Sequence, residues 1–409
     1  KPEPPRVAAI VTEFTYRSHA HVILENFLNP YLFNGRRTES GMKVVSLYLD
    51  QVPTRDMGRE VAERLGIPVV PTIAEALTLG GKGLAVDAVL SIGEHGRYPV
   101  NAKGQQEYPR KRFFDEIVGT FERVGKTAPV FNDKHLSYRW DWAKEMYDTS
   151  KRMGFPLMAG SSVPLAQRRP PLELAIGTKF RSAVSIHGGP VESYDIHGLE
   201  VMQSMVEART GGETGVAKVQ FLQGDAFWKA ADEGLWSIAL ADAALRAELG
   251  PDQPTLPELV KKAPFNQPPH AIHVTYRDGF AATMLKVGGY GSRWDFAALV
   301  NDEERPSATS FYVGPWNNRN LFKALSHAIQ DFFREGRAPY PVERTLLTTG
   351  VLDAAMDSRL AGGKVVETPH LAVAYQPRDF KAMREMGASW KIVTEETPEP
   401  KGLDSADRE

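Results

Sequence analysis

Hydrophobic residues in the first third of the chain alternate between short unbroken runs and longer segments with helical spacing. The unbroken runs are rich in Val, Ile and Leu and predict buried strands at 7–11, 44–49, 69–70, 86–92, 129–131 and 155–159. The segments between them predict helices at 18–28, 56–65, 73–79 and 140–153. Alternation of strands with helices is typical of a parallel, doubly wound sheet, which we expect here.

The pattern changes after residue 163. Longer strands joined by turns are predicted at 217–222, 270–276 and 279–287, with Arg277, Asp278 and Gly279 as a hairpin signal. Helices return at 320–334 and 342–360. This pattern predicts an α+β domain with a largely antiparallel open sheet. The expected division is therefore a linker at 1–6, a Rossmann-like domain at 7–162, an α+β substrate and oligomerisation domain at 163–392, and a polar, disordered tail at 393–409.

Composition narrows the class of protein without naming its chemistry. A chain of 409 residues is long enough for two domains, and no apolar run approaches the roughly 20 residues that a membrane helix needs. The net charge of −2 gives no electrostatic reason to expect nucleic acid as a partner. The chain has no cysteine, which removes disulfides and a cysteine nucleophile. It begins at Lys1 without a methionine, so cytoplasmic and exported locations both stay open.

The loop after the first strand lacks the glycines that a dinucleotide-binding unit uses. Such a unit places G-x-G-x-x-G there, so that the backbone can approach a pyrophosphate. Residues 12–17 read TEFTYR, and Glu13 adds negative charge where a diphosphate would lie. Either the chain holds a cofactor in another way, or it keeps a dehydrogenase scaffold for other work.

Four segments, taken in order, resemble motifs of the Gfo/Idh/MocA family, which includes glucose-fructose oxidoreductase and inositol dehydrogenase. Segment 87–95 (DAVLSIGEH) is similar to the family's D-x-V-x-I strand, and 132–137 (NDKHLS) is similar to its E-K-P-L-A motif. Segment 194–200 (YDIHGLE) is similar to D-x-G-x-H-x-x-D, and 341–369 resembles the family's C-terminal helix and final strand. The resemblance extends over most of the chain.

The resemblance implies a catalytic pair acting on a sugar or cyclitol. Lys134 would hold the substrate oxygen and His197 would remove a proton from it, with hydride passing to a nicotinamide. Asp195 is the expected partner of His197, with Glu192 as an alternative. Asp195 would face the same side as His197 on a strand, whereas on a helix the two would splay apart. A homo-oligomer is also expected.

Further candidates lie where the strands of the first domain end. Asp50 follows the second strand, where a dinucleotide enzyme contacts the adenosine ribose, and Glu94 and His95 follow the fourth. With Glu13 and Tyr16 of the first loop, these are the candidate contacts for NAD(P).

A divalent metal is a weaker expectation. The carboxylate of Glu13 and the imidazoles of His19 and His21 could join His95 or His197 at a metal ion. Their spacing matches no metal signature, and we assign no metal ligands.

Three functions remain open at this point. The first is a nicotinamide-dependent sugar or cyclitol oxidoreductase, against which the glycine-free loop weighs. The second is a keto-sugar lyase or hydratase that uses the same Lys134 and His197, with or without a metal as Lewis acid. The third is a sugar-binding or regulatory protein without turnover, and the presence of both Lys134 and His197 weighs against it.

Overall fold

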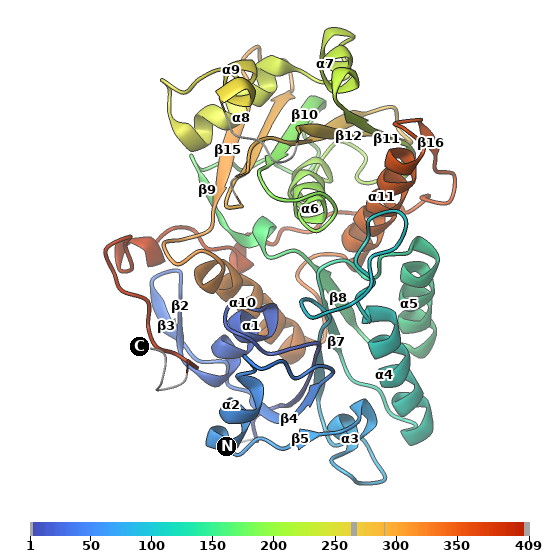
Figure 1. Ribbon diagram of the computed structural model, residues 1–409, viewed down its shortest axis with the longest axis vertical. Coiled ribbons are helices and arrows are strands. Elements are labelled where there is room, and N and C mark those ends of the chain that lie inside the picture. Colours follow the sequence, from blue (N-terminus) through green and yellow to red (C-terminus); the bar gives the residue numbers. More distant parts are fainter. Residues whose placement is uncertain (1–2, 263–267, 290, 405–409) are drawn as a thin grey trace.

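The fold contains two large β-sheets, which lie one above the other in Figure 1. The computed structural model describes residues 3–262, 268–289 and 291–404. The first sheet has the order β5-β4-β1-β6-β7-β8, and all its pairs are parallel. Its strands are β1 (Arg6–Val11), β4 (Lys43–Leu49), β5 (Val69–Val70), β6 (Ala88–Ile92), β7 (Val130–Asp133) and β8 (Leu157–Gly160). The expected parallel sheet is confirmed, and its carboxyl edge is the place where a ligand crevice forms in such sheets.

Helices cover both faces of the first sheet because its central strands are apolar on both sides. Ala8 and Ile10 of β1 belong to one buried cluster, and the alternate residues Val7 and Ala9 belong to another. The helices between the strands are α1 (His19–Leu28), α2 (Gly58–Leu65), α3 (Ile73–Thr78), α4 (Arg110–Val124) and α5 (Trp140–Met153). A short hairpin of β2 (Tyr31–Phe33) and β3 (Arg36–Thr38) follows α1. Gly66 ends α2 in the left-handed conformation that glycine adopts without strain.

The second sheet is mixed and mostly antiparallel, with the order β16-β11-β12-β13-β10-β14-β15-β9. Only the pair of β10 with β13 is parallel among the described pairs. Its strands are β9 (Gln167–Arg169), β10 (Phe180–His187), β11 (Val216–Gln223), β12 (His270–Tyr276), β13 (Ala281–Lys286), β14 (Trp294–Val300), β15 (Ser307–Tyr312) and β16 (Val366–Glu367). The hairpin predicted at Asp278 and Gly279 joins β12 to β13. The predicted fold class, a parallel Rossmann-like sheet plus a largely antiparallel one, is confirmed.

Helices lie on both faces of this sheet as well. One face packs against α6 (Asp195–Val206) and α11 (Val342–Leu360). The other supports α7 (Asp225–Asp232) and α8 (Ile238–Leu249), with α9 (Leu256–Lys262) packed against α8. Short 3-10 turns occur at η1 (Val163–Leu165), η2 (Lys381–Met383) and η3 (Ser389–Lys391). Among the described helices, none combines the length and apolar character needed to cross a bilayer.

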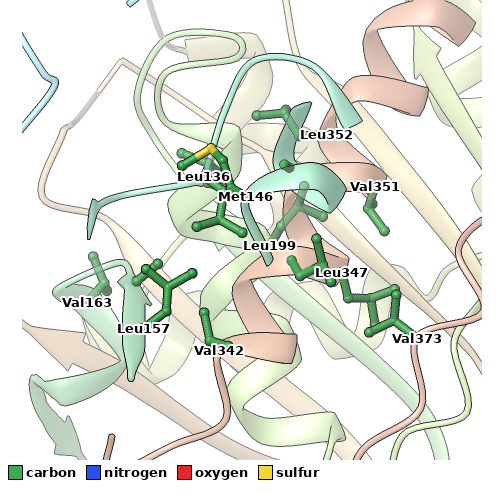
Figure 2. Close-up of a cluster of buried hydrophobic side chains, with 14 of the residues drawn as sticks. Leu136, Met146, Leu157, Val163, Leu199, Val342, Leu347, Val351, Leu352 and Val373 are labelled. Carbon is green, nitrogen blue, oxygen red and sulfur yellow. The ribbon is translucent and has the colours of Figure 1, made fainter. Parts of the chain in front are cut away.

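Two helices from the second half of the chain tie the sheets together. Helix α10 (Asn318–Glu335) returns to the first sheet and lies along α1, where Asn26 donates to Ser326 at 3.1 Å and Gln330 donates to the carbonyl of Asn26 at 2.9 Å (Figure 1). Helix α11 runs beside α5 and α6. Figure 2 shows the cluster at this junction, in which Leu347 of α11 lies among side chains from both halves, including Leu157 and Leu199.

The last stretch of chain differs from the disorder that its composition predicts. Leu403 is 2% exposed, and Glu399 binds Arg17 and Arg319, so this stretch lies against α1 and α10. The partners of its apolar and acidic side chains come from segments distant in sequence, so the local composition cannot reveal them. Residues 405–409 of the expected tail and residues 1–2 of the expected linker lie outside the described residues.

Candidate active site

A cavity of about 460 Å³ lies between the carboxyl edge of the first sheet and helix α6. Its walls come from α1, from the loops that follow β6 and β7, and from α6, β14 and α10. The polar side chains that line it are His19, Glu94, His95, Tyr108, Lys134, Ser162, Ser193, Tyr194, His197, Ser292, Asn317 and Asn318. Lys134 and His197, far apart in sequence, therefore line one cavity.

Lys134 is held by two fixed acceptors at the end of β7. Its ammonium donates to Glu94 Oε1 at 2.8 Å and to the carbonyl of Ser193 at 3.0 Å. Glu94 also binds Arg110, so one buried carboxylate lies between two cations. Burial opposes ionisation of Glu94, but the charges of Lys134 and Arg110 lower the pKa of this carboxyl well below its usual value. An ammonium has three donors, and the third remains for a ligand.

His197 lies in the first turn of α6, beside Ser161. Its Nδ1 is 2.6 Å from the Ser161 hydroxyl oxygen, so Nε2 is the nitrogen left for a ligand. Burial, followed by the nearby charge of Lys134, lowers the pKa of His197 well below its usual value. The imidazole is therefore neutral near pH 7, which is the form that can accept a proton. The rings of Tyr194 and Trp294 stack at 5.4 Å, and the Trp294 ring also meets His197 edge-on at 5.4 Å.

Asp195 does not reach His197, because the segment is helical and residues two apart on a helix point in different directions. Its Oδ1 instead accepts from Nε2 of His187 at 2.8 Å and of His270 at 2.7 Å. Burial opposes ionisation of Asp195, but His270 and His187 lower its pKa. The expected pairing of Asp195 with His197 is corrected here: Asp195 belongs to a separate, fully buried network.

This network is the one group within the described residues whose His, Asp or Glu ligand atoms could surround a metal ion. Its hydrogen bonds do not suit a metal. The backbone N–H of Gly189 donates to Nδ1 of His187 at 3.2 Å, so Nε2 of His187 must carry the ring proton that it donates to Asp195. A protonated nitrogen has no lone pair for a metal. Glu13, His19 and His21, which the sequence offered as metal ligands, do not form such a group within the described residues.

Glu192, the alternative partner for His197, faces another histidine. Its Oε1 is 3.7 Å from Nε2 of His135, and both side chains are buried. Burial raises the pKa of Glu192 to about 7 and lowers that of His135. The carboxyl of Glu192 can thus be neutral at physiological pH.

The loop expected to meet a diphosphate is filled by its own side chains. Phe14 is 1% exposed, in the cluster beneath α1. The hydroxyl of Ser18 accepts from the N–H groups of Thr15 at 3.1 Å and His21 at 3.3 Å. The N–H of Arg17 donates to Nδ1 of His21 at 2.8 Å. The N–H of His21 in the first turn of α1, and those of Thr15 and Arg17 before it, are therefore already used and do not face a phosphate.

The other residues that we expected to contact a cofactor already have hydrogen-bond partners within the protein. Asp50 accepts from the hydroxyls of Tyr48 at 2.7 Å and Tyr98 at 2.6 Å, and it also pairs with Arg112. The other two lie in the first loop: Glu13 accepts from Thr15 at 2.9 Å, and Tyr16 donates to Glu399 at 3.1 Å. Together with the filled loop, these contacts do not fit a dinucleotide bound in the usual Rossmann manner. Glu94 and His95 do line the cavity.

One pair at the site was not recognised from the sequence. His19 Nδ1 lies 2.5 Å from Asp133 Oδ2, with the two side chains 10% and 1% exposed. Asp133 ends β7, and His19 begins α1 after the loop that follows β1, so both belong to the carboxyl edge of the first sheet. That shared edge was the available signal. Burial, followed by the charge of His19, lowers the pKa of the adjacent His95 to about 4.

Solved structures with the same arrangement include inositol dehydrogenases. Myo-inositol dehydrogenase from Lactobacillus casei, solved with NAD(H) and myo-inositol, is 14% identical, with 92% of this chain and 99% of that chain covered at a TM-score of 0.54. GenD2 from gentamicin A biosynthesis, solved with NAD, is 12% identical, with coverage of 89% and 96% and a TM-score of 0.56. Myo-inositol 2-dehydrogenase from Lactobacillus plantarum is also 12% identical, with coverage of 89% and 99% and a TM-score of 0.52. The chain has the fold of these three proteins.

The resemblance to Gfo/Idh/MocA proteins is thus confirmed at the level of the fold. No family model and no curated sequence matches the chain. The low identity leaves the chemistry to be argued from the cavity itself.

Proposed function

We propose that this protein acts on a keto-sugar or keto-cyclitol and transfers protons next to the carbonyl group, as a lyase or hydratase. The observation that carries the proposal is the contrast between two places on the same sheet edge. Lys134 and His197 line an open cavity, whereas the loop that would hold a dinucleotide is filled by Phe14 and capped by Ser18.

The proposed reaction needs a base, a stabiliser for negative charge and no oxidant. In the tautomer that carries the ring proton on Nδ1, where that N–H donates to Ser161, Nε2 of His197 removes the proton from the carbon next to the carbonyl. The electrons of the broken C–H bond form an enolate, and the free donor of Lys134 stabilises its oxygen. The enolate then expels the oxygen substituent two carbons from the carbonyl carbon, which leaves with its bonding electrons and gains a proton. The products are an enone and an alcohol or water, and the reverse reaction hydrates the enone.

A nicotinamide-dependent oxidation of a sugar or cyclitol is the second candidate. The comparisons favour it, because a similar myo-inositol dehydrogenase was solved with NAD(H) and myo-inositol, and the similar GenD2 was solved with NAD. His197 would then remove a hydroxyl proton while Lys134 held the oxygen. The saturated contacts of Asp50 and the glycine-free loop are the observations against it.

Proton exchange at carbon separates the two candidates. The purified protein is incubated in D₂O with a methyl 3-ketoglucoside, and loss of the proton next to the carbonyl is followed by NMR without added nicotinamide. We expect exchange by the wild type and a loss of at least about 100-fold in His197→Gln and Lys134→Met. Calorimetric titration with NAD(H) and NADP(H) runs in parallel. Submillimolar binding with no exchange would overturn the proposal in favour of the oxidoreductase.

A further inference from the structure

We infer that His19, oriented by Asp133, is a second acid–base group of this cavity and serves the oxygen that leaves in elimination. The inference rests on the proposed function, because it assigns one step of that reaction. His19 is the first residue of α1, whereas His197 lies on α6, yet both side chains line the same cavity.

The geometry fixes which nitrogen of His19 meets a ligand. An ionised carboxylate can only accept hydrogen bonds, so at 2.5 Å from Asp133 the Nδ1 atom of His19 is the donor. Nε2 is then the nitrogen presented to the cavity, with either a lone pair or a proton. The rings of His95 at 5.0 Å and Phe322 at 4.5 Å meet the imidazole edge-on and restrict its rotation. A carboxylate that fixes the tautomer and orientation of an imidazole is the arrangement that acid–base catalysis uses.

Each reacting position of the proposed elimination can be assigned one group of the cavity. An elimination next to a carbonyl has three such positions: the carbonyl oxygen, the adjacent C–H bond and the leaving oxygen. Lys134 is assigned to the first and His197 to the second. Of the remaining ionisable groups that line the cavity, Glu94 is bound in its ion pairs, which leaves His19, His95, Tyr108 and Tyr194. His19 is the one whose ring is held by a carboxylate.

The proton balance is complete without another reactant. In elimination, Nε2–H of His19 gives its proton to the departing oxygen as the carbon–oxygen bond breaks. His197 has meanwhile taken the carbon-bound proton, and solvent restores both imidazoles. In hydration, Nε2 of His19 removes a proton from water as its oxygen adds to the enone, and His197 returns a proton to carbon. His19 is thus a catalytic residue, and Asp133 is a positioning residue.

Leaving-group dependence tests this assignment. Two substrates are compared, a methyl and a 4-nitrophenyl 3-ketoglucoside, because methoxide needs protonation to leave and nitrophenolate does not. In His19→Gln we expect elimination of the methyl compound to fall at least about 100-fold and that of the nitrophenyl compound to fall less than about threefold. Asp133→Asn should shift this ratio of rates in the same direction by a smaller factor. His273→Gln, on β12 and outside the cavity, is the matched control and should leave the ratio unchanged.

The ratio is measured within one protein sample, so a partly unfolded variant still reports it. Exchange of the carbon-bound proton should persist in His19→Gln, because His197 performs that step. Equal losses on both substrates would make His19 structural and overturn the assignment. Loss of exchange in His19→Gln would also overturn it, by making His19 the first base. A wild type that neither exchanges nor eliminates would instead remove the proposed function itself.

Discussion

At the scale of single residues, Glu192 links protonation to stability. Burial raises its pKa to about 7, from an ordinary value of 4.5. A carboxyl whose pKa is raised on folding stabilises the protein fully below its unfolded pKa and loses that contribution as the pH rises through the folded pKa. The relevant window therefore runs from about pH 4.5 to 7 and just above. Across it, the protein should lose at most about 3 kcal/mol of unfolding free energy through this group.

The measurement is the difference in unfolding free energy between the wild type and Glu192→Gln from pH 5 to 8. Glutamine cannot ionise, so the variant should gain relative to the wild type as the pH rises. Glu122→Gln, exposed on α4, is the control and should follow the wild type. A difference that does not change with pH would show that Glu192 is ionised throughout or is not buried in solution.

The Asp195 network supplies a second prediction. Asp195 accepts from both His187 and His270 and is fully buried. Asp195→Asn keeps the volume but removes the charge and turns one acceptor into a donor, so it should cost about 3 kcal/mol, measured by urea unfolding. Metal analysis of the wild type should find no stoichiometric ion. A bound metal that disappears in Asp195→Asn would instead make this network a metal centre.

The residues that sequence reasoning placed well are those fixed by strand ends. Lys134 follows β7 and lines the cavity because parallel strands end along one edge. Asp195 was misplaced in the pairing with His197 because the pattern of 194–200 did not distinguish strand from helix. The contact of His19 with Asp133 was not predicted, because the sheet edge brings α1 and β7 together but no local pattern pairs two side chains that are 114 residues apart.

At the scale of elements, two helical glycines give a matched pair. A β-carbon at Gly350 of α11 would lie 2.3 Å from Leu371 and 2.7 Å from the Trp140 ring, whereas one at Gly119 of α4 would meet nothing within 4 Å. Alanine favours a helix over glycine by about 1 kcal/mol, and overpacking costs about 1–3 kcal/mol. Gly119→Ala should therefore raise the unfolding free energy and Gly350→Ala should lower it. Thermal or urea unfolding of both variants checks the signs, and stabilisation by Gly350→Ala would contradict the close packing of α11.

The elements that could be predicted share a clear local pattern. The bounds of α5 and α11 match the predicted helices, because their apolar positions recur with helical spacing. Strands β10, β14 and β15 were not predicted. In β10, the polar Ser185 and His187 face inward against α6, where they find partners in Gly198 and Asp195. Alternation of apolar and polar residues cannot reveal a strand whose polar residues are buried by tertiary contacts.

At the scale of the whole molecule, the departures from the dehydrogenase pattern support one another. The loop after β1 lacks glycine, Phe14 fills it, and Glu399 from the far end of the chain binds Arg17 beside it. Each change alone would weaken a dinucleotide site. Together they close the surface there, whereas the same sheet edge stays open at the cavity that Lys134 and His197 line.

The two sheets should also unfold together. One buried cluster includes Ile10 of β1, Leu199 of α6 and Leu347 of α11, so the apolar core is continuous across the junction in Figure 2. Independent unfolding of either sheet would expose this shared surface, which makes a partly folded state costly. Hydrogen exchange of peptides from β6 and β12, followed across a urea series, should give coincident midpoints.

A pair of substitutions tests whether the junction creates this coupling. Leu347→Ala, at the junction, should lower the midpoints of β6 and β12 by the same amount, because a buried Leu→Ala costs about 2–5 kcal/mol wherever its cavity forms. Leu245→Ala removes an equally buried side chain from the layer of α8, which belongs to a separate cluster. If the sheets are coupled, this distant cavity must also shift the midpoint of β6. A shift confined to β12 would show that the sheets fold as two independent units.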